Sequence, residues 1–344
     1  MPFPSLSRQL LIGVAALGTA LSAFADKTVL NVYTALETDQ LKAYQQAFNK
    51  SYPDIDIKWT RDSTGIITAK LIAEKSSPVA DVVMGVAASS MVVFERAGML
   101  QPYAPANLKE ITPRYRAAGS VPTWVGMNVW GAAICYNVIE MQKQGLPRIE
   151  SWKDLLKPEF KGKIAMPNPA SSGTGFLDVT AWLQIFGEKG GWDYMDKLHD
   201  NVAVYTHSGS KPCKMAGAGE FPVGISFEYR ANATRNQGAP IEIVYPKEGL
   251  GWDIEAIAIV KNTPRLDAAR KLADWAATRE AMSLYANNFA IVAMPGIATR
   301  LKHVPTDYEQ RLVKNDFALI GKNRDAVLAE WQKRFAAKSE AKAK

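Results

Sequence analysis

Histidine and cysteine are scarce in this chain, and several common catalytic motifs are missing. Its 344 residues include only 3 histidines and 2 cysteines, and three scattered histidines cannot build a standard zinc site. The absence of a G-x-x-x-x-G-K-[ST] loop excludes a P-loop ATPase. There is no G-x-S-x-G nucleophile turn and no H-E-x-x-H motif. Gly173-Thr174-Gly175 lacks the third glycine of the dinucleotide fingerprint, so no motif here predicts an enzyme.

The start of the chain has the pattern of a targeting segment. Arg8 is the only charged residue among residues 1–25, and an apolar core from Leu10 to Leu21 precedes Ala23-Phe24-Ala25, a small-x-small cleavage pattern. We therefore interpret residues 1–25 as a signal peptide, and we expect the mature protein to be exported. No cysteine follows the cleavage site, which argues against a bacterial lipid anchor, and no later stretch reaches membrane-spanning length.

The two cysteines, Cys135 and Cys213, form an even pair in an exported chain, which favours one disulfide. The alternative is two separate buried thiols. Because no C-x-x-C motif is present, we expect a structural bond rather than a redox centre.

The formal net charge is +7, and a basic surface can indicate nucleic-acid binding. Here the positive residues are scattered, and the basic end of the chain is typical of a solvated helix tail. We expect no nucleic-acid partner, no metal, no cofactor and a monomeric protein.

Strand and helix patterns alternate in two separate parts of the chain. In the first part, strand patterns at 29–33, 55–59 and 80–86 alternate with helix patterns at 36–48 and 66–75, which predicts a parallel sheet with right-handed crossovers. A second alternation has strand patterns at 163–166, 202–205, 223–227 and 241–245, and helix patterns at 175–186, 192–198, 210–218 and 228–237.

The apolar stretches 124–136 and 252–260 are long enough to run between two lobes, and helices are expected at 266–286 and 308–337. We predict an α/β protein with two lobes, each a mostly parallel sheet flanked by helices, joined by two crossing strands. The first lobe is predicted to contain residues 26–128 and 252–300, and the second lobe residues 129–251 and 301–344.

Hydroxyl-rich turns follow three of the predicted strands: Tyr33-Thr34-Ala35-Leu36-Glu37, Asp62-Ser63-Thr64-Gly65 and Ser171-Ser172-Gly173-Thr174. The first N–H groups of a helix are unpaired and partly positive, and Ser and Thr add O–H donors. Because ligands in open α/β sheets lie at the carboxyl ends of strands, we expect these turns to form one site for a compact oxyanion. The alternative is ordinary helix capping, including a capping box from Thr34 and Glu37.

A fourth turn and several carboxylates extend the candidate site. Tyr205-Thr206-His207-Ser208-Gly209-Ser210-Lys211 adds hydroxyls and His207, which either donates to an oxyanion or is an ordinary hydrogen-bonded polar residue. The cationic end of a ligand would meet a carboxylate from the set Glu37, Glu228, Asp253 and Glu255. Aromatic faces also attract ammonium groups, and the candidates, with core packing as the alternative, are Tyr33, Tyr205, Phe227, Tyr229 and Trp252.

These segments resemble the aminoethylphosphonate-binding proteins of bacterial ABC importers, within the ferric-binding-like group of periplasmic binding proteins. The most specific matches are Met166–Gly175 and Tyr205–Lys214, and the others are Val32–Glu37, Arg61–Gly65, Pro122–Met127 and Gly249–Asp253. The resemblance implies a type II periplasmic-binding-protein fold that closes on a solute and delivers it to an inner-membrane ABC permease without catalysing a reaction. The ferric-ion branch typically uses adjacent tyrosines, and the lack of a Tyr-Tyr pair argues against iron.

The sequence and the resemblance together predict a periplasmic receptor for aminoethylphosphonate. The expected phosphonate ligands are Thr34, Ser63, Thr64, Gly65, Ser171, Ser172, Gly173 and Thr174. The amine is expected to meet Glu37, Glu228 or Asp253 beside Tyr205 or Trp252, and Tyr33 and His207 complete the predicted site. The alternatives are a receptor for another small phosphorylated or cationic solute, and an exported phosphatase or transferase on the same fold.

Overall fold

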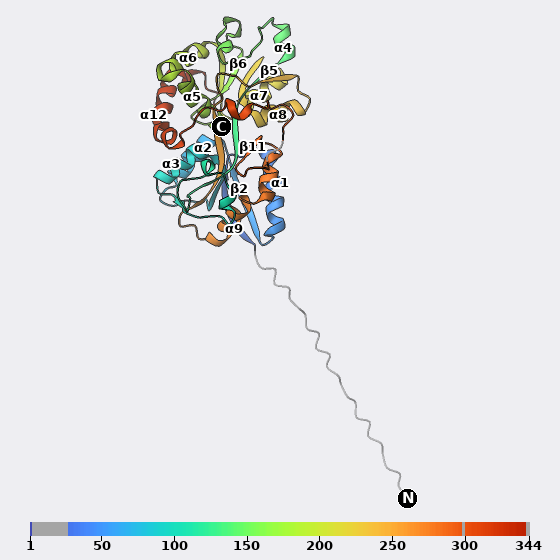
Figure 1. Ribbon diagram of the computed structural model, residues 1–344, viewed down its shortest axis with the longest axis vertical. Coiled ribbons are helices and arrows are strands. Elements are labelled where there is room, and N and C mark those ends of the chain that lie inside the picture. Colours follow the sequence, from blue (N-terminus) through green and yellow to red (C-terminus); the bar gives the residue numbers. More distant parts are fainter. Residues whose placement is uncertain (2–26, 298–299, 342–344) are drawn as a thin grey trace.

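The computed structural model of the protein describes Met1, residues 27–297 and residues 300–341, so the predicted signal peptide lies outside the described residues except for Met1. Figure 1 shows two parts of the molecule one above the other, and each contains a hydrophobic core. The first core draws on residues 30–129 and 252–294. The second draws mainly on residues 130–250. We call the parts of the chain around them the first lobe and the second lobe.

The described residues form a single mixed sheet that continues through both lobes. Its strands are β1 (Thr28–Thr34), β2 (Ile55–Arg61), β3 (Val82–Ala87), β4 (Leu100–Gln101), β5 (Val125–Asn137), β6 (Ile164–Pro167), β7 (Val202–Thr206), β8 (Val223–Phe227), β9 (Ile241–Val244), β10 (Trp252–Val260) and β11 (Ile291–Val292). The order is β2-β1-β3-β10-β5-β8-β6-β7, with β4 beside β10 and both β9 and β11 beside β5. β1 is parallel to β2 and β3, and β6 is parallel to β7 and β8.

Strand β5 connects the two lobes. Its first half pairs antiparallel with β10, from Val125 opposite Ile257 to Gly131 opposite Trp252. Its second half pairs with β8 and β9 in the second lobe. Because β5 and β10 lie side by side between the lobes, the predicted pair of crossing strands and the two-lobed α/β architecture are confirmed.

Helices flank the sheet in both lobes (Figure 1). Their bounds are α1 (Thr38–Ser51), α2 (Thr64–Ala73), α3 (Ala88–Arg96), α4 (Val138–Lys143), α5 (Gly173–Ile185), α6 (Gly187–Asn201), α7 (Lys211–Ala218), α8 (Glu228–Asn236), α9 (Leu266–Ala276), α10 (Arg279–Ala286), α11 (Tyr308–Arg311) and α12 (Phe317–Phe335). Helix α1 illustrates why they form: it buries Tyr44, Ala47 and Phe48, the spacing of one helical face. Strand β3 is buried along its whole length, as a continuous apolar run requires.

The prediction of one helix over residues 308–337 is wrong. Leu250 N–H donates to Arg311 O (2.7 Å) and Val313 N–H donates to Leu250 O (3.1 Å), so the chain is extended between α11 and α12. A new helix then begins after Asp316, whose Oδ1 accepts from Leu319 N–H at 3.0 Å.

The predicted helix over residues 266–286 is also divided, into α9 and α10. Thr278 starts the second helix, because its Oγ1 accepts from Ala281 N–H at 3.1 Å.

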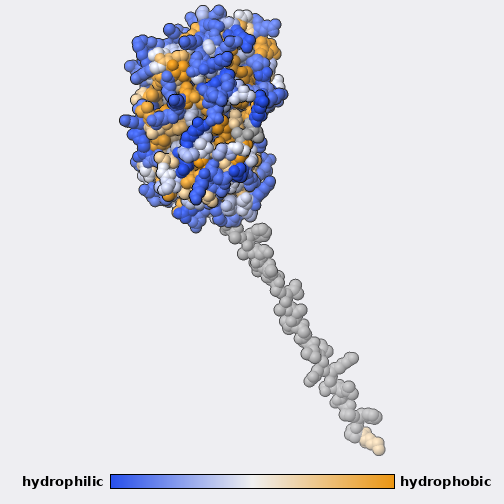
Figure 2. All heavy atoms as spheres, in the orientation of Figure 1, coloured by the Kyte–Doolittle hydropathy of each residue, from blue (hydrophilic) through white to orange (hydrophobic). Residues whose placement is uncertain are grey.

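The predicted disulfide is confirmed: Cys135 of β5 is bonded to Cys213 of α7, with a Cα–Cα distance of 5.4 Å. On the face shown in Figure 2, hydrophilic residues are spread over both lobes, with hydrophobic residues in small groups between them. Within the described residues, none of the helices combines the length and the apolar character needed to cross a membrane.

Candidate ligand-binding site

A narrow cavity lies between the two lobes, and the centre of a water molecule can occupy a volume of about 40 Å³ within it. The first lobe contributes polar residues from the turns after β1 and β2, and the second lobe contributes the turns after β6 and β7. The residues of these turns that line it are Ala35, Glu37, Arg61, Ser63, Thr64, Ser172, Gly173, Thr174, Ser208 and Gly209. The walls are completed by Gly85 and Ala87 of β3, Trp130 of β5, Phe227 of β8 and Glu255 of β10.

Hydrogen-bond donors from both lobes face this cavity without a protein partner. Among the described residues, no hydrogen bond is made by the side-chain hydroxyl of Ser63, Thr64 or Thr174. Thr64 is the first residue of α2, and Gly173 and Thr174 are the first two of α5, so their N–H groups lie beyond the reach of helical acceptors. The cavity therefore presents hydroxyl and N–H donors at two helix starts.

Ordinary helix capping, the alternative to ligand binding, accounts for only some of the residues in these turns. Ser172 Oγ accepts from Gly175 N–H at 3.4 Å and so caps α5, whereas Ser63 precedes α2 without a side-chain cap bond. The capping box predicted for Thr34 and Glu37 forms one turn later, where Glu37 N–H donates to Gln40 Oε1 at 2.9 Å. Thr34 Oγ1 instead accepts from Leu36 N–H at 3.1 Å.

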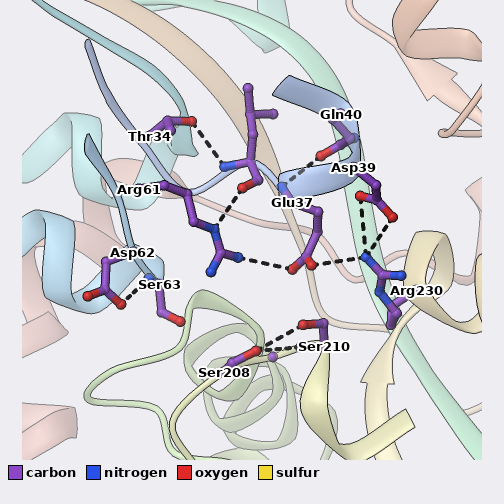
Figure 3. A network of polar contacts seen from close by, with 12 residues as sticks. Thr34, Glu37, Asp39, Gln40, Arg61, Asp62, Ser63, Ser208, Ser210 and Arg230 are labelled. Carbon is purple, nitrogen blue, oxygen red and sulfur yellow. Dashed lines mark hydrogen bonds and ion pairs between the residues drawn. The ribbon is translucent and has the colours of Figure 1, made fainter. Parts of the chain in front are cut away.

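Glu37 is held between two arginines that the sequence analysis did not assign (Figure 3). Arg230 Nη2 of the second lobe lies 2.9 Å from Glu37 Oε2 and 3.2 Å from Asp39 Oδ2. Arg61 Nη2 lies 3.4 Å from Glu37 Oε1, and Arg61 Nε donates to Leu36 O at 3.0 Å. Because Arg61 also lines the cavity, it brings a positive charge to the donor-rich turns.

The lobes also meet through direct hydrogen bonds beside the cavity. Gly65 N–H donates to Ser171 O at 2.8 Å. His207 Nε2 lies 3.1 Å from Asp62 Oδ1, and both side chains are half-exposed. The predicted residues Gly65, Ser171 and His207 therefore hold the two lobes together rather than lining the cavity.

Three acids near the strands that join the lobes have raised pKa values; Glu228 and Asp253 are buried, and Glu255 is partly buried. Burial raises the pKa of Glu228 to about 8. Burial, together with the charges of Glu228 and Glu37, raises the pKa of Glu255 to about 8. Burial raises the pKa of Asp253 to about 6, against the lowering effect of its hydrogen bonds with Ser89 and Ile254 and of the charge of Arg324. Of these three, only Glu255 lines the cavity.

Several predicted aromatic residues lie in the cores instead of the cavity. Tyr33 donates its hydroxyl to Glu74 at 2.9 Å. The hydroxyl of Tyr205 lies 2.9 Å from His199 Nδ1. The indole N–H of Trp252 donates to Val313 O at 2.6 Å. These bonds turn the polar ends of all three side chains away from the cavity lining.

Sequence patterns did not predict Arg61, Arg230 or Trp130 as site residues. Arg61 is the last residue of β2, and its position at the carboxyl end of a strand was a usable signal. Arg230 follows no comparable pattern, because it contacts Glu37 only where the second lobe packs against the first. Trp130 lies within β5, between the lobes, and nothing in the local pattern indicates which side chains of this strand line the cavity.

Comparison with known proteins gives a consistent result. The sequence profile of the family described as "Bacterial extracellular solute-binding protein" matches residues 77–319, which is more than half of the chain. An uncharacterized protein of Haemophilus influenzae is 29% identical over 96% of this chain and 98% of its own length. A Salmonella typhi protein named as a candidate 2-aminoethylphosphonate-binding periplasmic protein is 26% identical over 81% of this chain and 82% of its own.

Among solved structures, the periplasmic binding protein AfuA from Actinobacillus pleuropneumoniae, with fructose-6-phosphate bound, is 27% identical, with a TM-score of 0.84. The alignment covers 90% of this chain and 99% of AfuA. This likeness confirms the predicted type II periplasmic-binding-protein fold.

Proposed function

Because the chain belongs to the family of bacterial extracellular solute-binding proteins, and is thus the periplasmic solute-binding component of an ABC transporter, we propose that its solute is 2-aminoethylphosphonate. One observation carries the proposal: unpaired donors from both lobes surround a cavity whose wall also holds a carboxyl group without a cationic partner. A small zwitterion with an oxyanion at one end and an ammonium at the other matches both.

The phosphonate is assigned to the donor-rich turns. Its oxygens would accept from the hydroxyls of Ser63, Thr64 and Thr174, with Arg61 balancing the charge. Hydrogen bonds to a charged group contribute about 1.5–3 kcal/mol each. The two helix starts add their N–H groups, which favour an anion.

The ammonium is assigned to the acidic and aromatic wall. Glu255 lines the cavity, and so do Trp130 and Phe227, whose rings meet edge to face with centroids 5.8 Å apart. Aromatic rings attract ammonium groups through their faces. Glu37 is the other carboxylate that lines this cavity, and it is already paired with Arg61 and Arg230.

A phosphorylated sugar is the second candidate, because AfuA was solved with fructose-6-phosphate and is 27% identical to this chain. The donor-rich turns would bind its phosphate equally well. The two ligands differ at the other end, where a sugar brings hydroxyl groups and 2-aminoethylphosphonate brings a positive charge.

Titration calorimetry of the purified mature chain tests the proposal. We expect binding of 2-aminoethylphosphonate to be at least tenfold tighter than binding of inorganic phosphate, fructose-6-phosphate or ethylphosphonate, which lacks the amine. No heat with 2-aminoethylphosphonate, together with tight binding of phosphate or of the sugar phosphate, would overturn the assignment. Turnover of a chromogenic phosphate ester would instead favour an exported phosphatase.

A further inference from the structure

Glu255 differs from the other acid that lines the cavity. Within the described chain, Glu37 lies between two arginines, whereas no cation is paired with Glu255. The Oε2 atom of Glu255 is buried and has no hydrogen-bond partner. An unpaired buried carboxylate is costly, so this position calls either for a retained proton or for a positively charged ligand.

A second acid lies close enough to influence Glu255. Glu228 is fully buried; its Oε2 accepts from Gly131 N–H at 2.9 Å and its Oε1 has no partner. The charge of Glu228 opposes ionisation of Glu255, and the pKa of each is raised to about 8, first of all by burial. The titratable and polar groups that surround Glu255 are Glu228, Glu37, Asn128, Tyr44 and Tyr285.

Trp130 supplies an independent sign that the cavity takes a polar ligand. Its side chain is only 6% exposed, lines the cavity and has an indole N–H without an acceptor. A buried donor without an acceptor costs free energy that a ligand oxygen removes. Trp130 therefore lacks an acceptor and Glu255 lacks a cation, and both side chains line the same small cavity.

From this geometry we infer that Glu255, backed by Glu228, is the residue that selects an ammonium group, and that it carries a proton until the ammonium displaces it. The inference rests on the proposed function and refines it. The proton leaves the carboxyl oxygen of Glu255 for the buffer, and the ammonium takes its place as the positive charge. The ligand keeps all its own protons, and no covalent bond of the ligand changes.

Calorimetry can measure the number of protons that are released when the ligand binds. A group with a pKa of about 8 is about three quarters protonated at pH 7.5. Binding of 2-aminoethylphosphonate at pH 7.5 is therefore expected to release up to about 0.75 proton, which appears as a difference in binding heat between Tris and HEPES buffers. The phosphonate adds little at this pH, because the ammonium group of the same ligand lowers the second pKa of its phosphonate.

The variant Glu255→Gln keeps the shape and removes the charge. We expect it to release no proton and to lose at least about tenfold in its preference for 2-aminoethylphosphonate over ethylphosphonate, as expected for a charge-assisted hydrogen bond. Glu242→Gln is the matched control, because Glu242 lies away from the cavity, 2.7 Å from Arg235. It should keep the proton release and the preference of the wild type. A cooperative thermal unfolding transition in each variant would show that both are folded.

The outcomes separate the two claims. Tight binding of 2-aminoethylphosphonate without proton release, or an unchanged preference in Glu255→Gln, overturns the role of Glu255 and leaves the proposed function standing. Failure of the wild type to bind either 2-aminoethylphosphonate or O-phosphoethanolamine, which carries the same amine, overturns the proposed function and this inference together. Proton release that is lost only in Glu255→Gln supports both.

Discussion

The pH dependence of protein stability directly tests whether the pKa of Glu228 is raised. Glu228 is fully buried, accepts one backbone hydrogen bond from Gly131 and has one oxygen without a partner. Its pKa is raised from an ordinary 4.5 to about 8 by burial. The folded protein therefore holds this proton over a pH range in which the unfolded chain has lost it.

The sign and size of the pH effect on stability follow from the difference in the pKa of Glu228 between the folded and unfolded states. Below about pH 4.5 both states are protonated and Glu228 has no effect on the pH dependence of unfolding. Between pH 4.5 and 8 the folded state binds about one proton more, so stability falls as the pH rises, by about 1.4 kcal/mol for each unit. From pH 5 to pH 8 the loss is about 3 to 4 kcal/mol, an order-of-magnitude figure.

Glu228→Gln removes this dependence while keeping an oxygen that accepts from Gly131. We expect the variant to match the wild type within about 1 kcal/mol at pH 5 and to exceed it by about 3 kcal/mol at pH 8. Urea unfolding followed by tryptophan fluorescence at both pH values measures the difference. Glu242→Gln serves as the control, because it removes a carboxylate whose ion pair with Arg235 is half-exposed, and its effect on stability should be similar at both pH values. A gap between Glu228→Gln and wild type that is the same at both pH values would refute the reasoning.

Three further predictions concern closure, the anion end and the disulfide. Gly65→Ala adds a methyl group that would lie against Ala170 O and 2.8 Å from Ser171 O of the second lobe. Because this contact would push the two lobes apart, ligand affinity should fall at least tenfold in calorimetry while the unfolding temperature changes little. Thr174→Ala should weaken phosphonate binding by at least about 1 kcal/mol, and unchanged affinity would remove Thr174 from the site. Reduction of the Cys135–Cys213 bond, which spans 78 residues, should lower stability by about 4 kcal/mol in the chain-entropy account, measured by urea unfolding with and without a reductant.

The positions of the hydroxyl-rich turns could be predicted because their signals are local. A strand pattern followed by Ser, Thr and Gly and then by a helix pattern indicates where a helix starts, as at Ser63 and Ser172. The alternation of strands and helices then sets which turns share one edge of the sheet. Nothing beyond neighbouring residues was needed for this part of the architecture.

The directions of aromatic side chains could not be predicted in the same way. Trp252 begins β10, yet its ring packs edge-on against Tyr115 and Phe317 in the first core. Tyr205 lies near the end of β7 and packs against Trp331, which arrives from a helix far along the chain. A strand alternates its side chains between two faces, and which face is covered depends on elements that the local pattern does not identify.

The ion pair between Arg230 and Glu37 is a contact between the lobes that local sequence patterns cannot predict. The two residues are 193 positions apart, and only the approach of the lobes brings them within 2.9 Å. Taking both charges out of water offsets most of their attraction, so this pair gives closure its geometry but little net free energy. The donors at Ser63, Thr64 and Thr174 gain partners only from a ligand. Under the proposed function, the contacts of the ligand with both lobes, rather than the ion pair, would supply the free energy that holds the lobes together.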